Sequence, residues 1–93
     1  MTIEECKNIL ESEGFLHIYE WKDEANAVYS SHAHKDKVVI FVTDGSVEFD
    51  FSGEKKIVAK GERFNVPAGV VHSAVTGIDG CHYVVGEMIE GDS

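Results

Sequence analysis

The chain has 93 residues, of which 43% are hydrophobic and 27% charged, which is typical of one globular domain. Eight basic against 17 acidic residues give a net charge of −9, so neither nucleic acid nor an anionic membrane surface is expected as a partner. No apolar run approaches the roughly 20 residues that span a bilayer, and the first residues lack the basic-then-apolar order of a signal peptide. We therefore expect one cytoplasmic domain over residues 1–93.

The two cysteines, Cys6 and Cys81, agree with a cytoplasmic protein, because secreted domains of this size usually carry several disulfides. A single disulfide between them stays an open alternative. For Cys81 we expect burial in the core.

Residues 1–14 predict a helical extension. Thr2 and Glu5 have the spacing of a capping box, and Gly14 supplies a stop signal. Four apolar side chains recur at helical spacing and share one face: Ile3, Cys6, Ile9 and Leu10.

From residue 15 to about residue 90 the chain has strand character, cut by turn residues into short pieces. Asp44-Gly45 is a strong two-residue hairpin signal, and Gly77 and Gly80 are expected to separate the last two strands. About eight short strands at this spacing predict an antiparallel sandwich or barrel. Since no strands alternate with long helices, a doubly wound nucleotide-binding fold is not expected.

Two of the five histidines, His32 and His34, lie two residues apart just before the strand expected at 38–43. In extended backbone such residues project to the same face, so both imidazoles can converge on one point. Divalent metals accept neutral imidazole nitrogens, and the pair could form half of a site. Taken alone, the pair is weak evidence for a site, and two solvated histidines at a strand end are the plainer interpretation.

A second element lies downstream, where residues 61–72 read G-x5-P-x-G-x2-H. Gly61 permits a tight turn, and Pro67 and Gly69 force a sharp bend between strands. The bend re-aims His72 toward the interior.

The chain contains two motifs that resemble, in residues and in order, those of the cupin superfamily, small β-barrels of the jelly-roll type. The first reads His32-x-His34-x3-Val38-x6-Gly45, and the second is the segment that ends at His72. The resemblance covers most of the chain. It implies an all-β fold, a cupin-type double-stranded β-helix of a single-domain, stand-alone protein, here preceded by the short N-terminal helix. It also implies that His32, His34 and His72 bind one metal ion inside the barrel.

The sequence departs from the family at one ligand position. Cupins commonly carry a glutamate where this chain has Val38, and Val39, one residue further, is also apolar. Asp36 could replace that carboxylate, but its place in a loop favours a solvated turn residue. Thr76 also stands where many members have an asparagine. Without the carboxylate we expect iron, zinc or nickel, with copper and manganese as further candidates.

The resemblance to three-histidine members implies a metal-dependent oxygenase that acts on a small molecule. A non-catalytic, metal-containing module that binds or senses a small molecule is the alternative, and a vestigial metal site is a third. Inward-facing Ile40, Val42 and Ala74 predict a largely apolar pocket for a small aromatic or aliphatic ligand. Arg63 is the only arginine, which argues against multiply anionic substrates.

The sequence identifies no catalytic residue. On the last strand, His82 or Glu87 could reach the cavity, depending on which face points inward, although a surface position is the plainer expectation for each. Cys81 and Tyr83 share the face opposite to His82, and we expect them to be buried in packing. His17 is expected in packing or an interface.

The strand expected at 38–43 is apolar on both faces. If Ile40 and Val42 point into the barrel, Val39 and Phe41 lie on the other face and need a second cover. So small a barrel has few elements to supply one. We therefore expect a homodimer, with the outer face of this sheet, or its edge, at the interface.

Overall fold

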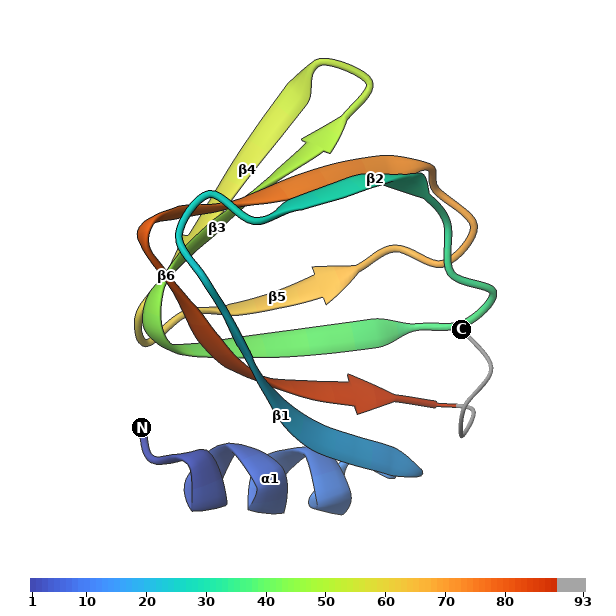
Figure 1. Cartoon of the computed structure of the whole chain (residues 1–93). Coiled ribbons are helices and arrows are strands. Elements are labelled where there is room, and N and C mark those ends of the chain that lie inside the picture. The colour runs from blue at the N-terminus through green and yellow to red at the C-terminus, as the bar shows by residue number, and fades with distance from the viewer. Residues whose placement is uncertain (89–93) are drawn as a thin grey trace.

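The computed structural model describes residues 1–88 and shows one six-stranded antiparallel sheet that curves over on itself, with a helix outside it (Figure 1). In chain order the elements are α1 (Ile3–Ser12), β1 (His17–Asp23), β2 (Val28–His32), β3 (Val38–Phe51), β4 (Glu54–Ala59), β5 (Arg63–Val66) and β6 (His72–Glu87). The predicted class, all-β with one N-terminal helix, is confirmed. The expected end of the barrel near residue 90 lies outside the described residues.

The N-terminal helix forms for the local reasons that the sequence indicated. The side chain of Thr2 accepts the amide of Glu5 at 3.1 Å, and the Glu5 carboxylate accepts the amide of Thr2 at 2.8 Å. These hydrogen bonds to Thr2 lower the pKa of Glu5. The chain leaves the helix through Gly14, whose φ is +90°. Within the described residues, no helix is long and apolar enough to cross a membrane.

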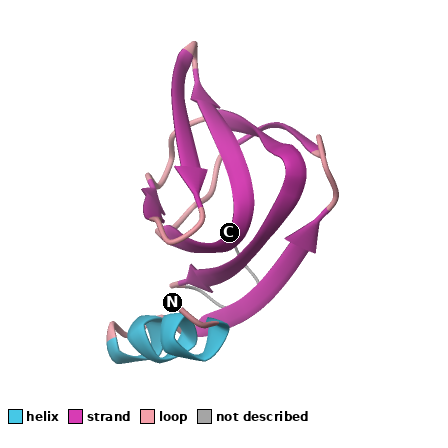
Figure 2. Ribbon diagram, turned by 90° about the vertical axis from the view of Figure 1, so that its left-hand side faces the viewer, coloured by secondary structure: helices cyan, strands magenta, loops and turns pink. Residues whose placement is uncertain are grey.

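Two long strands, β3 and β6, form the spine of the sheet. They pair from Val38 opposite Glu87 to Asp50 opposite Ser73. Strands β1 and β5 flank one half of this pair, and β2 and β4 flank the other half. Because β3 and β6 bend, the two halves face each other and enclose the interior (Figure 2).

The hairpin predicted at Asp44-Gly45 and the break predicted at Gly77 and Gly80 are wrong, since β3 and β6 each continue through these positions. The pairing register between the strands shifts on either side of Gly45, whose φ is +73°. A Cβ atom there would lie 2.1 Å from the carbonyl oxygen of Gly80. The glycines therefore bend two continuous strands, and six strands take the place of about eight.

The predicted alternation along the first part of β3 is confirmed. The inward side chains, Val38, Ile40 and Val42, belong to the interior cluster. On the other face, Val39 and Phe41 belong to a second buried cluster.

The cover of that outer face comes from the N-terminal segment of the same chain. Cys6 and Leu10 of α1, with Phe15 after it, share the second cluster with Val39 and Phe41. The premise that this face needs a second subunit is therefore wrong. Dimerisation by another route stays a prediction.

Candidate metal centre

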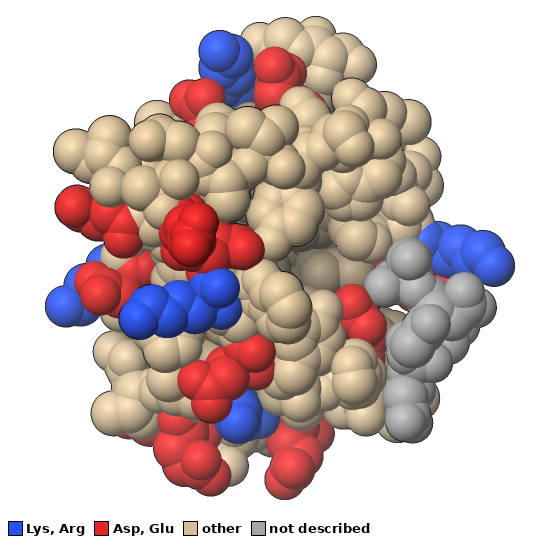
Figure 3. Space-filling model, in the orientation of Figure 1, with Lys and Arg blue, Asp and Glu red and all other residues tan. Residues whose placement is uncertain are grey.

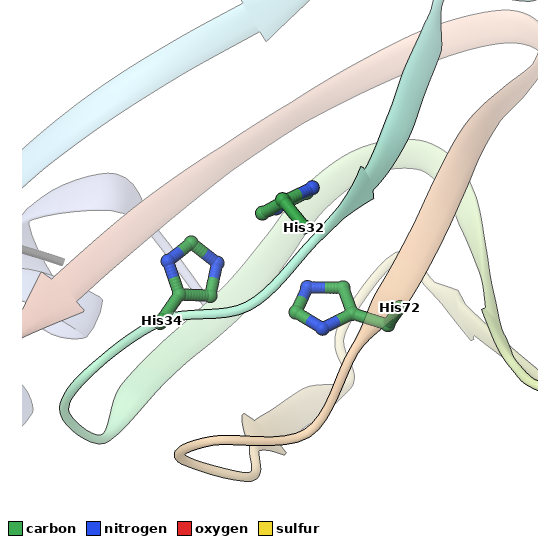
Figure 4. A group of neighbouring side chains, drawn as sticks. All are labelled: His32, His34 and His72. Carbon is green, nitrogen blue, oxygen red and sulfur yellow. The ribbon is translucent and has the colours of Figure 1, made fainter.

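Three histidines from two strand ends and a loop lie together at the rim of the barrel. His32 ends β2, His34 follows it by two residues, and His72 begins β6 (Figure 4). Their ring centroids are 4.5 to 5.3 Å apart, and one nitrogen of each ring lies within 4.8 Å of the others. The structure thus brings together the three residues that the motifs singled out.

Backbone carbonyls orient two of the rings. Nδ1 of His32 is 2.7 Å from the carbonyl oxygen of Ser30, and Nδ1 of His72 is 3.0 Å from that of Val70. A carbonyl oxygen can only accept, so each Nδ1 carries the proton and donates it. In the neutral form of each ring the lone pair then lies on Nε2, and this is the form in which imidazole binds a metal ion.

The third ring is held neutral by its surroundings. Burial lowers the pKa of His34, and the neighbouring His32 and His72 lower it further, while Glu87 opposes them. Nδ1 of His34 is buried and has no hydrogen-bond partner among the described residues.

Three imidazoles this close together form, in their neutral state, a donor set that fits a divalent transition metal ion. Bonds of roughly 2.0–2.1 Å to one ion place two nitrogens no more than about 4.2 Å apart. Small changes in side-chain torsion would therefore be enough for these rings to share an ion.

The histidines open onto a cavity of about 170 Å³. Its apolar wall includes Ile40, Phe49 and Val85, as expected for a largely apolar pocket. The volume is close to the roughly 150 Å³ of an engineered apolar cavity that holds benzene. The face seen in Figure 3 is hollowed near its middle, with acidic side chains around the hollow.

Glu87 faces this cavity, which the sequence could not decide. Its side chain is only 8% exposed, and its Oε2 atom accepts a hydrogen bond from the hydroxyl of Tyr19 at 3.1 Å. Burial, followed by the charge of Glu87, raises the pKa of Tyr19 to about 12. Tyr19 is therefore a neutral donor at physiological pH.

Other candidates lie elsewhere. His82 points outward, where its Nε2 atom is 3.0 Å from a carboxylate oxygen of Glu20. Asp36 does not belong to the close group of potential ligands, which among the described residues consists of the three histidines. Cys81 is buried in the interior cluster, as expected, and burial raises its pKa to about 12.

The alternative of a disulfide between the two cysteines is excluded, because both are free and buried in different clusters. Thr76, which stands where many cupins have an asparagine, is buried away from the cavity lining. Its hydroxyl donates to the carbonyl of Glu24 at 2.6 Å and accepts the amide of Ala27 at 2.8 Å. Thr76 therefore fastens the turn between β1 and β2.

An aromatic surface beside the cavity was not predicted. Asp23 accepts hydrogen bonds from the indole of Trp21 at 3.0 Å and from the hydroxyls of Tyr29 and Tyr83 at 2.7 and 2.8 Å. A second hollow of about 480 Å³ lies here. We call this hollow the aromatic entrance, and its lining residues are His17, Tyr19, Trp21, Tyr29, Tyr83 and Val85.

Burial raises the pKa of Tyr83, so its hydroxyl keeps its proton and remains a donor. Since Tyr19, Tyr29, Tyr83 and Val85 line both hollows, the entrance adjoins the cavity.

Residues 19–85 match the sequence profile of the family described as "Cupin domain". The chain belongs to the cupin family. No match is found among curated proteins. Among solved structures, this cupin is similar to KdgF from Halomonas sp., with 22% identity and a TM-score of 0.71 over 84% of this chain and 73% of that one.

Two further structures are more similar in sequence. Protein NMB1881 from Neisseria meningitidis has 28% identity and a TM-score of 0.69, over 82% of this chain and 75% of that one. The polyketide cyclase RemF from Streptomyces resistomycificus has 26% identity and a TM-score of 0.66, over 77% of this chain and 54% of that one. The solved structures similar to this chain thus include an enzyme.

Proposed function

We propose that this cupin is a metal-dependent oxygenase acting on a small, largely apolar molecule, with His32, His34 and His72 as the metal ligands. One observation carries the proposal: the cavity that the three imidazoles face also contains the buried carboxylate of Glu87, which accepts a hydrogen bond from the half-buried Tyr19. Iron, zinc and nickel suit such a ligand set, with copper and manganese as further candidates. A bound ion would supply Lewis-acid or redox chemistry.

The protein's own residues would bind and orient the substrate. Ile40, Phe49 and Val85 offer apolar contacts, and the cavity volume of about 170 Å³ limits the substrate to a small aromatic or aliphatic group. Glu87 can accept a proton from a substrate at the carboxylate oxygen that now accepts from Tyr19. The hydroxyl of Tyr19 could then donate a hydrogen bond either to the substrate or, as now, to the carboxyl group of Glu87.

A non-catalytic module that binds or senses a small molecule is the second candidate. It would use the same cavity, whose volume of about 170 Å³ is large enough for one small apolar molecule. Such a module would use the same three histidines and the same apolar wall.

Metal analysis followed by oxygen uptake separates these functions. Protein purified without a histidine tag should retain close to one transition metal ion per chain. The iron-loaded form should consume oxygen only with a small aromatic or aliphatic substrate, and removal of the metal should abolish this uptake. Ligands that raise the melting temperature without oxygen uptake would instead support the binding module. Absence of bound metal after metal-replete growth would refute both.

We also propose that the protein is a homodimer in the cytoplasm, where buried free thiols such as Cys6 and Cys81 persist. With one outer face covered by α1, the open apolar side chains include Val28 of β2 and Ile57 of β4, which are 76% and 58% exposed. Light scattering at micromolar concentration should give twice the chain mass. The mass of a single chain would refute the dimer.

A further inference from the structure

Glu87 is the one acidic side chain among the buried polar and charged side chains of the described residues. Strand register accounts for its position, because Glu87 ends β6 directly opposite Val38 of β3, and both line the cavity with the histidines. Its carboxylate is not one of the atoms that lie within 4.8 Å of one another at the candidate centre. Glu87 is thus a near neighbour of the three rings without being one of the close group.

The three rings differ in what their second nitrogen contacts. Nδ1 of His32 and Nδ1 of His72 each donate to a backbone carbonyl, whereas Nδ1 of His34 is buried without such a partner among the described residues. Glu87 lines the same cavity as the His34 ring. A buried carboxylate therefore shares the cavity with the one ring whose Nδ1 has no hydrogen-bond partner among the described residues.

We propose that Glu87 is the outer carboxylate of the metal centre and stabilises a bound ion through His34, as a positioning residue and not as a ligand. The inference rests on the proposed three-histidine site. Three neutral ligands leave the double positive charge of the ion uncompensated in an apolar cavity, where a nearby carboxylate attracts it far more strongly than in water. Nδ1 of His34 has no hydrogen-bond partner among the described residues, so a carboxylate that acts on this nitrogen once the ion is bound would also fix the orientation of the ring.

The substitution Glu87→Gln tests this role, because it removes the charge and keeps the shape and the acceptor for Tyr19. The zinc dissociation constant of the tag-free apoprotein, measured by competition with a chelating dye, should rise about 10- to 100-fold. Glu48→Gln removes the same charge from the outer side of β3 and is the matched control, with an expected change of less than about twofold. Equal constants for the two variants would overturn the proposal.

A second readout follows His34 itself. In the zinc-loaded protein, the nitrogen-15 NMR resonances of the His34 ring should shift in Glu87→Gln. The resonances of the His72 ring, whose Nδ1 donates to the carbonyl of Val70, should not change. An unchanged His34 ring would also overturn the role. If Glu87→Gln does not fold, Glu87→Asp keeps the charge and moves it; it should weaken zinc binding by a smaller factor, and unaltered affinity would count against the proposal.

The failure of this inference and of the proposed function can be distinguished. A wild-type protein that binds no zinc would refute the three-histidine site itself. Tight zinc binding by the wild type, undiminished in Glu87→Gln, would leave that site standing and remove only the role of Glu87.

Discussion

Truncation of His72 to alanine should remove most of the bound metal. Zinc sites with about four protein ligands bind with roughly 10–16 kcal/mol, or about 3 kcal/mol for each ligand. Since about 1.4 kcal/mol changes an equilibrium constant tenfold, the loss of one of three imidazoles should weaken binding at least about 100-fold. A protein that retains close to one ion per chain should then lose it during gel filtration.

The same substitution should leave the barrel folded. The His72 side chain is 2% exposed, and its ring centroid lies 5.9 Å from that of Phe49 and 5.4 Å from that of Phe51. Truncation therefore opens a hole beside these two rings, at a cost of about 2–5 kcal/mol in the free energy of unfolding. That cost is smaller than the stability of most single domains.

The assay combines elemental analysis of tag-free protein, zinc affinity by chelator competition, and circular dichroism of the apoprotein. His82→Ala is the matched control, because His82 lies on the outer face beside Glu20. It should keep the metal content and affinity of the wild type. Unaltered metal content in folded His72→Ala would exclude His72 from the site, and an equal loss in His82→Ala would show that binding does not depend on the cluster.

In urea denaturation, Gly45→Ala should destabilise the protein by about 1–3 kcal/mol more than Gly53→Ala. Both glycines have positive φ, but only a Cβ at Gly45 would strike the backbone of β6. Similar losses of stability in the two variants would refute the role of Gly45 in the bend. Between pH 10 and about 12 the stability of the wild type should fall more steeply than that of Tyr19→Phe. Burial beside Glu87 lets the folded state keep the phenol proton of Tyr19, whereas the unfolded chain releases it near pH 10. Parallel curves of stability against pH for the two proteins would contradict the raised pKa of Tyr19. Cys81 should resist alkylation at pH 8 until the protein unfolds, because burial keeps its thiol protonated; rapid labelling of native protein, located by mass spectrometry, would contradict this.

Local signals predicted what local interactions decide. The capping box of Thr2 and Glu5 needs contacts only within one helical turn, and it forms as expected. Asp44-Gly45 carries an equally strong local signal for a hairpin, yet β3 continues through it. There the pairing of β3 with β6 decides, and the positive φ of Gly45 serves a bulge. A turn dipeptide cannot reveal which of these two uses of glycine applies.

In the candidate site, too, some residues were predictable from local sequence and others were not. The resemblance of two short motifs to those of cupins was enough to predict His32, His34 and His72 as a group. The choice between His82 and Glu87 depended on which side of β6 faces inward, and that side follows from pairing with β3, about 40 residues earlier in the chain. No pattern within β6 alone contains that information.

The aromatic entrance shows a further limit. Asp23 holds Trp21 of its own strand, Tyr29 of β2 and Tyr83 of β6 through one carboxylate. The donors lie up to 60 residues away along the chain. The aromatic alternation of residues 15–21 was visible in the sequence, but the acidic residue that joins it to two other strands has no distinguishing neighbour in the chain.

The covering of β3 was predictable in principle, because the sequence contained two apolar surfaces that each lacked a partner. The face of α1 with Cys6 and Leu10 needs a surface to bury it, and the outer face of β3 with Val39 and Phe41 needs a cover. Pairing these surfaces within one chain requires no association in solution, whereas burial against a second subunit loses translational and rotational freedom. Intramolecular cover is therefore the favoured solution whenever an amphipathic helix can reach the exposed face. Any dimer of this cupin must consequently use a surface that α1 does not contact.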